Sequence, residues 1–331
     1  MNLIIQKSGI NEKSWDDLLK KSSTASWFQS KEAYDFYQNL PQLFTPFVVA
    51  VETTELRAVC VGYITKEKNI IKQYFSRRAI IYAGPMLADD CTEDEVENLL
   101  KGVKKVIGRR SIYTEIRNFH DYSKYKESFA SLGFNYIPWL NLQVDTSSQE
   151  IVEKNLSKSR KRDLRTSFRD GADIIDKPSI EQVRDWYEIL KKLYETKVKT
   201  PLFPCLFFEH LYQISSAHFL LVEVKKEIIG GTCVVGNTSI LYEWFVCGDE
   251  SNTYGIFPST VATYAGLNYA QEKGFKMFDM MGAGSPDVYY GVRDFKAKFG
   301  GKTVENGRYK CLNNKLLYKI GEFIINYLKN R

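Results

Sequence analysis

The sequence predicts an α/β (α+β) fold of two tandem domains, each built on a mixed central sheet that is flanked by helices. Residues 47–61 and 219–235, about half a chain apart, share one plan: an apolar strand, a polar turn and a second strand that carries a cysteine. In both cases a helical pattern precedes the hairpin, and a helix that leads into a further strand follows it. Two copies of one unit are therefore the simplest account of the chain.

The elements of the two copies follow in the same order. The expected helices and strands, in matching pairs, are helices at 30–40 and 180–197, helices at 92–107 and 260–273, and strands at 112–116 and 277–281. Residues 145–150 read Asp-Thr-Ser-Ser-Gln-Glu and have no apolar periodicity, so the boundary between the copies is expected there. The predicted domains are residues 1–145 and 146–331.

Length and charge limit the class of protein. With 331 residues and 44% hydrophobic content, the chain is long enough for two ordinary domains with a substantial core. The net charge of +6 is basic, but it stays below the level of a protein that coats nucleic acid. An anionic partner is therefore expected at a local patch, and DNA binding is not expected.

Cysteines and histidines form no metal-binding or redox pattern. The six cysteines are scattered without a Cys-x-x-Cys pair, which favours buried free thiols in a reducing compartment. His120, His210 and His218 form no i, i+4 pair, so neither a zinc site nor a histidine-centred triad is expected.

The first residues lack the apolar core of a signal peptide, and no apolar run approaches the ~18 residues that cross a bilayer, which predicts a cytoplasmic protein.

The densest charge follows the predicted boundary and is almost entirely positive. Residues 154–169 contain seven basic side chains and one acidic side chain. A helix is expected over 154–170, capped by Ser157 or Asn155 and ended by Gly171. Such a run often lies on a solvated face, but its one-sided charge favours a bound anion, with phosphate as the natural candidate. The expected contacts are Arg160, Lys161 and Arg165.

The last segment, residues 315–329, is expected to form an amphipathic helix with lysines at its flanks. Its apolar face is expected to pack against the fold. Contact with an anionic membrane surface is the alternative, and peripheral contact is the most that the sequence predicts.

Residues 289–301 read Tyr-Tyr-Gly-Val-Arg-Asp-Phe-Lys-Ala-Lys-Phe-Gly-Gly and place two lysines beside aromatic rings. On a strand, Lys296 and Lys298 would share one face. Phe295 and Phe299 would bracket them, so that an ammonium lies against apolar walls, where it can stabilise an oxyanion. An edge strand whose lysines reach water is the alternative. The same run supplies two further candidate substrate contacts, Tyr290 and Arg293.

Four motifs occur in order in the second half of the chain: the basic helix that closes at Gly171, a Gly-Gly-Thr hairpin at 230–232, the run at 264–282, and Val-Arg-Asp-Phe-Lys-Ala-Lys-Phe-Gly-Gly at 292–301. Together they resemble the FemAB family and related acetyltransferase-like proteins of the GNAT superfamily. The resemblance implies two tandem GNAT-like domains and the transfer of an acyl group onto an amine. In the Fem branch the donor is aminoacyl-tRNA and the acceptor is an amine of a peptidoglycan precursor.

The resemblance also implies roles for individual residues. Lys296 matches the lysine of the family's Phe-Lys motif and is expected to stabilise the oxyanion that forms when an amine attacks an ester or thioester. Asp279 matches the family's Asp before its Gly and is expected to take a proton or orient the amine; a strand-end Asp that bonds the next loop is the alternative. Tyr242 and Glu243 alternate to opposite faces of their strand, so at most one is expected to line the cleft.

One departure from the superfamily bears on the acyl donor. Acetyl-CoA enzymes of this fold carry a Gly-rich loop before a helix, and residues 249–260 instead read Asp-Glu-Ser-Asn-Thr-Tyr-Gly-Ile-Phe-Pro-Ser-Thr. Two acids and a single glycine replace the backbone nest that holds a pyrophosphate, which disfavours acyl-CoA and favours a tRNA-borne donor. The chain lacks the long heptad segment of the coiled-coil arm that tRNA-using Fem enzymes often carry, and this absence weakens the case for a tRNA-borne donor.

The sequence thus predicts a cytoplasmic acyltransferase that moves an aminoacyl or acyl group onto an amine of a cell-envelope precursor of peptidoglycan type. The acyl donor, aminoacyl-tRNA or acyl-CoA, is a co-substrate, and no cofactor or metal is expected. The acceptor is expected to be an anionic small molecule or a lipid-linked precursor, with tRNA as a further partner. Two alternatives remain: an acyl-CoA-dependent N-acyltransferase acting on a nucleotide-linked sugar in surface polysaccharide synthesis, and a catalytically silent module that binds such precursors or RNA.

Overall fold

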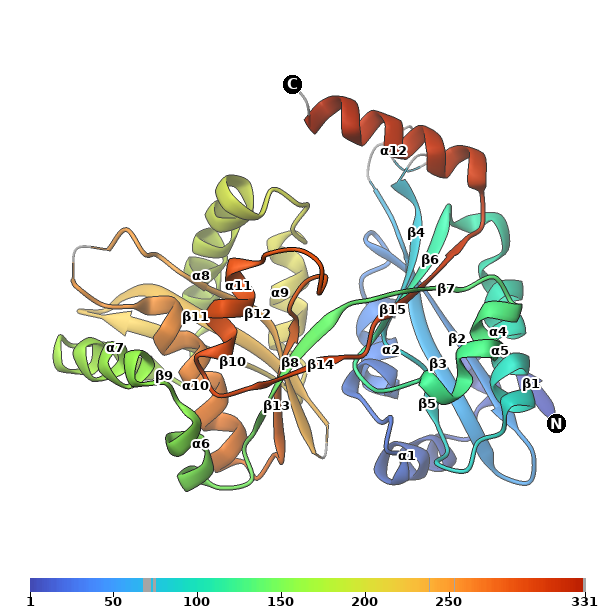
Figure 1. Ribbon diagram of the computed structural model, residues 1–331, viewed down its shortest axis with the longest axis horizontal. Helices are drawn as coiled ribbons and strands as arrows, with labels where there is room; N and C mark the ends of the chain where they lie inside the picture. Colours follow the sequence, from blue (N-terminus) through green and yellow to red (C-terminus); the bar gives the residue numbers. More distant parts are fainter. Residues whose placement is uncertain (68–72, 74–75, 238, 253, 330–331) are drawn as a thin grey trace. The chain divides into compact units, whose positions relative to one another are not determined.

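The computed structural model describes residues 1–331 apart from 68–72, 74–75, 238, 253 and 330–331, and it describes 323–329 by their backbone alone. The chain divides into two compact units. Unit 1 contains Met1–Trp139 and Glu305–Arg331, and unit 2 contains Leu140–Val304. Each unit is a mixed sheet with helices packed on it (Figure 1), so the predicted fold class is confirmed.

Sheet A belongs to unit 1 and is antiparallel except for one parallel pair, β4 with β6. Its strands lie in the order β1 (Asn2–Ile4), β2 (Phe44–Glu52), β3 (Leu56–Thr65), β4 (Arg78–Ala83), β6 (Tyr113–Asn118), β15 (Arg308–Leu312) and β7 (Asn135–Ile137), with β5 (Met86–Leu87) paired to β3.

The helices of unit 1 are α1 (Glu12–Lys21), α2 (Lys31–Gln38), α4 (Glu93–Ile107), α5 (Lys126–Ser131) and α12 (Lys315–Lys329). The predicted helix at 92–107 is α4, which begins at a capping box between Thr92 and Glu95. Its apolar stripe, with Val96 and Leu99 fully buried, packs onto sheet A in the core of the unit.

Sheet B belongs to unit 2 and contains the hairpin predicted at 219–235. Its strands lie in the order β14 (Lys302–Glu305), β8 (Leu140–Asp145), β13 (Met277–Gly282), β12 (Ile240–Gly248), β11 (Glu227–Gly236), β10 (Ala217–Val224) and β9 (Asp173–Ile175). β12 and β13 pair in parallel, as β4 and β6 do in sheet A. The two sheets therefore repeat one plan, as the sequence predicts.

The helices of unit 2 are α6 (Gln149–Asn155), α7 (Lys158–Arg169), α8 (Ile180–Leu193), α9 (Cys205–Tyr212), α10 (Pro258–Glu272) and α11 (Gly291–Ala297). Close packing sets α10 against the sheet, because a side chain at Gly266 would lie 2.8 Å from the ring of Phe278. The core of the unit forms between α10 and strands β8, β12 and β13.

Each sheet contains one strand from the other half of the chain. β8, from the end of the first copy, lies between β13 and β14, and β15, from the end of the second copy, lies between β6 and β7. Figure 1 shows this exchange as red β15 among the blue and green strands of sheet A. The compact units therefore differ from the predicted domains 1–145 and 146–331, because strand alternation specifies a strand's faces and not its partners.

Two predicted helices differ in detail from the structure. The helix expected at 154–170 is two helices, because the chain breaks at Leu156 and restarts at α7, where Ser157 caps the first turn. Gly171 follows α7 with φ of +96°, as a helix-ending glycine does. The C-terminal helix at 315–329 is confirmed as α12, while the side chains of its second half lie outside the described residues. Among the described residues, no helix is both long and apolar enough to cross a bilayer.

Candidate active site

The parallel strands β12 and β13 pair over three residues and then separate. Their register runs from Ile240↔Met277 to Tyr242↔Asp279. Beyond this point the pairing of β13 with β8 is also irregular, and Met281 adopts a left-handed conformation with φ of 58°, which is uncommon for a residue other than glycine. The separation frees backbone groups of the two strands, and the candidate site forms there.

Lys296 supplies a buried cation to β13. Its ammonium donates to the carbonyl oxygen of Met280 and, at 3.0 Å, to that of Gly282. Lys296 is 8% exposed, and burial lowers the pKa of its ammonium, while the carboxylates of Glu243 and Asp279 oppose that shift. No hydrogen bond to the described residues uses the third N–H, so it can serve a ligand.

The strand predicted for the run that contains Lys296 is wrong, because the run forms a helix. α11 spans Gly291–Ala297, and Lys298 is its C-terminal cap. Residues two apart on a helix do not share a face. Lys296 is accordingly buried and Lys298 exposed, which separates the two lysines that a strand would have grouped.

Glu243 places a carboxyl group near the ammonium of Lys296. It lies on β12, 4% exposed, near the hydroxyls of Thr263 and Thr232. Burial raises its pKa from 4.5 to about 7, although Lys296 and the two hydroxyls act to lower it. Neither carboxyl oxygen accepts a hydrogen bond of good geometry from any described residue. A buried carboxyl that titrates near neutrality and has unused oxygens is suited to accept a proton.

Asp279 is a second buried carboxyl beside Lys296, but it is held by partners. Its oxygens accept from Gln143 Nε2 at 3.0 Å and from the backbone N–H of Met281 at 2.6 Å. Burial raises its pKa to about 6, against the effect of these partners and of Lys296. Both of these partners lie on strands, Met281 on β13 itself and Gln143 on β8, so Asp279 is held within sheet B and belongs to the charged cluster.

The two neighbours on β12 face opposite sides, as strand alternation predicts. Glu243 faces α10 through Thr263, and Tyr242 lies beside Asp279 in the parallel register. Tyr242 is fully buried within unit 2. Glu243 is the member of this pair that interacts electrostatically with the ammonium of Lys296.

The other residues predicted in 289–301 mainly shape the site. Arg293 donates to the carbonyl oxygens of Ala283, Ser285 and Val288, so it fastens the loop that joins β13 to α11. Tyr290 precedes α11 and is 42% exposed. The rings of Phe295 and Phe299, which were predicted to bracket the lysines, lie against the guanidinium of Arg160, at 4.2 and 5.0 Å.

The basic helix α7 contains residues of two kinds. Arg160 is buried, pairs with Asp163 at 3.3 Å and donates to the carbonyl oxygen of Phe295, so it joins α7 to α11. Lys161 and Arg165 are exposed. The structure thus brings Arg160 to the helix that carries Lys296 and leaves the other two predicted contacts on the surface.

The N-terminus of α10 is where a GNAT enzyme would hold the pyrophosphate of CoA. Pro258 has no N–H to offer, and the N–H of Ser259 donates to the carboxylate of Glu250 at 3.2 Å. The N–H of Thr260 donates to the carbonyl oxygen of Phe257. A carboxylate therefore accepts from the N–H at the first turn of α10, where a phosphate oxygen would otherwise bind.

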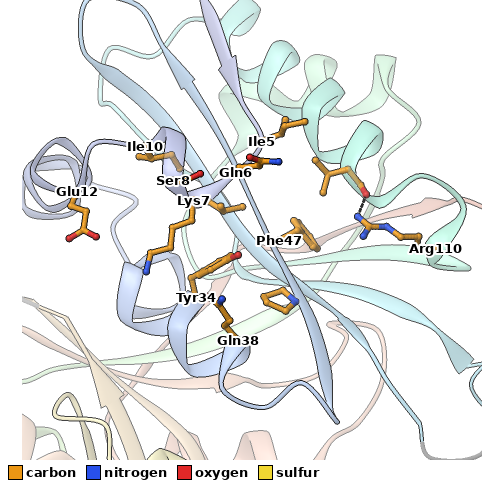
Figure 2. A pocket seen from close by; sticks show the side chains of 13 residues that line it. Ile5, Gln6, Lys7, Ser8, Ile10, Glu12, Tyr34, Gln38, Phe47 and Arg110 are labelled. Atoms are coloured by element: carbon orange, nitrogen blue, oxygen red, sulfur yellow. Dashed lines mark hydrogen bonds between the residues drawn. The ribbon is translucent and has the colours of Figure 1, made fainter.

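Unit 1 lacks this arrangement. Its parallel pair stays in register from Arg78↔Tyr113 to Ala83↔Asn118 and does not separate. A surface cavity of about 730 Å³ does open in unit 1, near the ion pair of Lys7 with Asp35, but none of its lining residues belongs to the Lys296 cluster (Figure 2). Across the described ranges, no group of three or more His, Cys, Asp or Glu side chains could hold a metal ion.

Three features of the site were not predicted from the sequence. Gln143 reaches Asp279 from β8, which belongs to the other copy, and no local pattern indicates that contact. The sequence shows two acidic residues before α10, but it does not indicate that Glu250 accepts a hydrogen bond from the first turn of that helix. The pairing of Glu243 with Lys296 depends on where β12 and β13 separate, which hydrophobic alternation does not encode.

Comparison with known proteins finds likeness in structure alone. A scan against models of protein families finds no match, and a search of curated proteins finds none at significant similarity.

Among solved structures, FemX superposes with a TM-score of 0.73 at 13% identity, covering 97% of this chain and 99% of FemX. The C-terminal domain of a putative lysylphosphatidylglycerol synthetase from Agrobacterium fabrum gives 0.56 at 13% identity, with 96% and 95% covered. A tandem GNAT protein from the clavulanic acid biosynthesis pathway gives 0.58 at 9% identity, with 94% and 99% covered. The chain therefore has the tandem GNAT fold that it shares with FemX.

Proposed function

We propose that this protein is a cytoplasmic acyltransferase that moves an aminoacyl or acyl group onto an amine of a cell-envelope precursor. The observation that carries the proposal is the buried cluster of Lys296, Glu243 and Asp279 where β12 and β13 separate in a GNAT fold. A cluster of buried titratable groups with perturbed pKa values is typical of a catalytic site, and it supports this proposal.

The proposed chemistry assigns one step to each side chain. The acceptor amine attacks the carbonyl carbon of the acyl ester, and the third N–H of Lys296 stabilises the resulting oxyanion. Glu243 takes the proton that the attacking nitrogen loses, for which a pKa of about 7 is well placed. The ester C–O bond then breaks, and Glu243 passes the proton it has taken to the departing oxygen, so that the donor leaves with a free hydroxyl. Asp279, held by Gln143, keeps the ammonium of Lys296 charged and in place.

Two contacts favour an aminoacyl-tRNA over acyl-CoA as the donor. Glu250 puts a negative charge at the first turn of α10, where the pyrophosphate of CoA would have to bind. Lys161 and Arg165 are exposed cations on a helix whose buried Arg160 contacts α11, so phosphates bound there would lie on the element next to Lys296. FemX and lysylphosphatidylglycerol synthetase share this fold, and the name of the second describes transfer of a lysyl group.

The acceptor follows from charge and from the resemblance to Fem proteins. An anionic precursor of peptidoglycan type, either nucleotide-linked or lipid-linked, offers both an amine and phosphates for basic side chains. A nucleotide-linked amino sugar has the same two features and is the acceptor of the competing acyl-CoA mechanism.

The test supplies each donor with each acceptor. Purified protein is incubated with total aminoacyl-tRNA or acetyl-CoA, together with a UDP-linked peptidoglycan precursor or a UDP-linked amino sugar, and products are identified by mass spectrometry. We expect an aminoacylated peptidoglycan precursor that depends on tRNA and is lost in Lys296→Met. Lys298→Met, which changes an exposed lysine on the same helix, is the matched control and should keep activity. If acetyl-CoA were the donor that gives a product and aminoacyl-tRNA gave none, the donor assignment would be contradicted. If no donor and acceptor pair gave a product, the proposed acyltransferase activity would be contradicted.

A further inference from the structure

Unit 1 contains a row of charged side chains that is separate from the Lys296 cluster. The register aligns Tyr82 of β4 with Arg117 of β6, and Arg117 with Arg308 of β15. Like charges directly opposite each other on neighbouring strands destabilise a sheet. Glu115 compensates in part, since it accepts from Arg117 Nε at 2.7 Å and from Arg308 Nη1 at 3.1 Å. Two guanidinium groups thus share one carboxylate, and Lys310, which lies opposite Glu115 in the register, adds a third cation, so positive charge is in excess here.

Both arginines keep N–H groups that no described residue accepts. Arg117 uses Nε for Glu115 and Nη1 for the hydroxyl of Tyr82 at 2.8 Å, which leaves Nη2. Arg308 uses Nη1, which leaves Nε and Nη2. Their side chains are 25% and 20% exposed, and none of these unused nitrogens is among the buried unpartnered atoms, so the free N–H groups face solvent. The row is therefore open to a ligand.

Neutral donors beside the arginines also lack partners. The indole Nε1 of Trp139, whose ring lies 3.7 Å from the guanidinium of Arg308, is buried and makes no hydrogen bond to the described residues. The same is true of the hydroxyl of Tyr37, which lies close enough to Arg117 for that cation to lower its pKa, although burial raises it overall. Buried donors without acceptors are rare in folded proteins, and here they accompany an excess of cations. A ligand that carries negative charge and accepts hydrogen bonds would suit both the cations and these donors.

The geometry of the guanidinium groups selects among anions. An aromatic ring lies against one face of each guanidinium, Trp139 at Arg308 and Tyr82 at Arg117, the second at 5.0 Å. The N–H groups point along the edge, in the plane of each group, and a planar carboxylate matches that fork.

We propose that Arg117 and Arg308 bind the carboxylate group of a ligand in unit 1. Arg308 reaches this place because β15 is exchanged into sheet A, so the last strand of the chain completes the site. In support, burial and the neighbouring Arg117 lower the pKa of Arg308 to about 10, and a bound carboxylate would relieve both effects. The proposal does not depend on the acyl transfer proposed for unit 2.

The test follows the indole N–H of Trp139 by ¹H–¹⁵N NMR in the full chain, with its signal assigned from Trp139→Phe. N-acetylglycine supplies the carboxylate, N-acetylglycinamide is the neutral control, and inorganic phosphate is the competing anion. We expect saturable shifts of the Trp139 signal with N-acetylglycine and none with the amide. Equal shifts with the amide, or no shift with either, would overturn the proposal. Saturation by phosphate without saturation by N-acetylglycine would overturn the carboxylate assignment.

Substitutions test the two arginines directly. Arg308→Gln should weaken N-acetylglycine binding at least ~10-fold, because one fork of the site is lost. Its folding should be preserved, because the pair of Arg117 with Glu115 remains; thermal unfolding checks this. Arg308→Lys keeps the charge but not the fork, and it should bind more weakly than the wild type and more tightly than Arg308→Gln. Arg109→Gln removes an exposed cation of unit 1 and is the charge-matched control. Unchanged binding in folded Arg308→Gln would refute the site.

Discussion

The ammonium of Lys296 and the carboxyl of Glu243 are both buried in unit 2, and each favours the charged form of the other although burial disfavours both charges. Their titrations are therefore linked, so that a change in one group moves the pKa of the other. This relationship makes the protonation state of the site sensitive to substitution and to pH near neutrality.

Lys296→Met should reduce acyl transfer at least ~100-fold, because the variant loses the cation that faces the developing oxyanion. It should also raise the pKa of Glu243 and Asp279 further, since Lys296 lowers both. Steady-state kinetics and the pH profile of kcat measure these effects, with Lys298→Met as the control on the same helix. Turnover close to that of the wild type would show that Lys296 has no electrostatic role.

Glu243→Gln should change how stability depends on pH. Burial raises the pKa of Glu243 from 4.5 to about 7, so between these values the folded protein holds a proton that the unfolded chain has released. Stability from this group is therefore present below pH 4.5 and is lost as pH rises to 7, by up to about 3 kcal/mol. Glu243→Gln should flatten that decline in urea unfolding at a series of pH values. A slope identical to that of the wild type would contradict the raised pKa.

Asp279→Asn provides the comparison for that series. Burial raises the pKa of Asp279 from 3.8 to about 6, so its effect on stability falls between those values. The variant should flatten the decline below pH 6 and leave the decline from pH 6 to 7, which belongs to Glu243. If Asp279→Asn also removes the decline from pH 6 to 7, the two carboxyls titrate as one unit.

Substitutions in α7 should affect stability according to how deeply each side chain is buried. Arg160→Gln should destabilise the protein by ~2–3 kcal/mol, because it removes the nearest buried partner of Asp163 and a contact with α11. Lys161→Gln and Arg165→Gln should leave stability within about 0.5 kcal/mol. If they touch phosphate, the double variant should instead reduce the slope of log affinity for the tRNA donor against log salt concentration. An unchanged slope would show that both residues lie on a solvated face and contact no phosphate.

The repeat and the fold were predictable because hairpins, helices and turns leave local patterns of alternation. The strand assigned to the run with Lys296 was wrong for the same reason: a short stretch that alternates lysines with aromatic residues satisfies a strand pattern, and the packing of Phe299 in the core selects a helix. In an element as short as α11, tertiary packing decides the secondary structure more than the local sequence pattern does.

The parts that could not be predicted depend on pairing between distant segments. No pattern near Arg308 indicates that it will lie opposite Arg117, and none near Gln143 indicates that it will reach Asp279. Both contacts follow from the exchanged strands β15 and β8, whose partners lie in the other half of the chain. The sequence located Lys296 and Asp279 through a motif, but their neighbours follow from topology.

The exchanged strand β15 should hold unit 1 together. Tyr309 on β15 is 2% exposed, and its ring stacks on Phe129 of α5 at 4.0 Å. Tyr309→Ala should therefore destabilise unit 1 by ~3–5 kcal/mol. Hydrogen exchange measured by mass spectrometry should show faster exchange in β6 and β7, which flank β15, and little change in sheet B.

The matched variant on the other exchanged strand should have the reciprocal effect. Leu142 lies on β8, is fully buried, and belongs to the core of unit 2. Leu142→Ala should destabilise by ~2–5 kcal/mol and speed exchange in β13 and β14 of unit 2, although residue 142 precedes most of that unit in sequence. Each variant is then the control for the other, because the same kind of cavity is made in opposite sheets. If Leu142→Ala loosened sheet A, or Tyr309→Ala loosened sheet B, the exchanged strands would not belong to the units assigned to them.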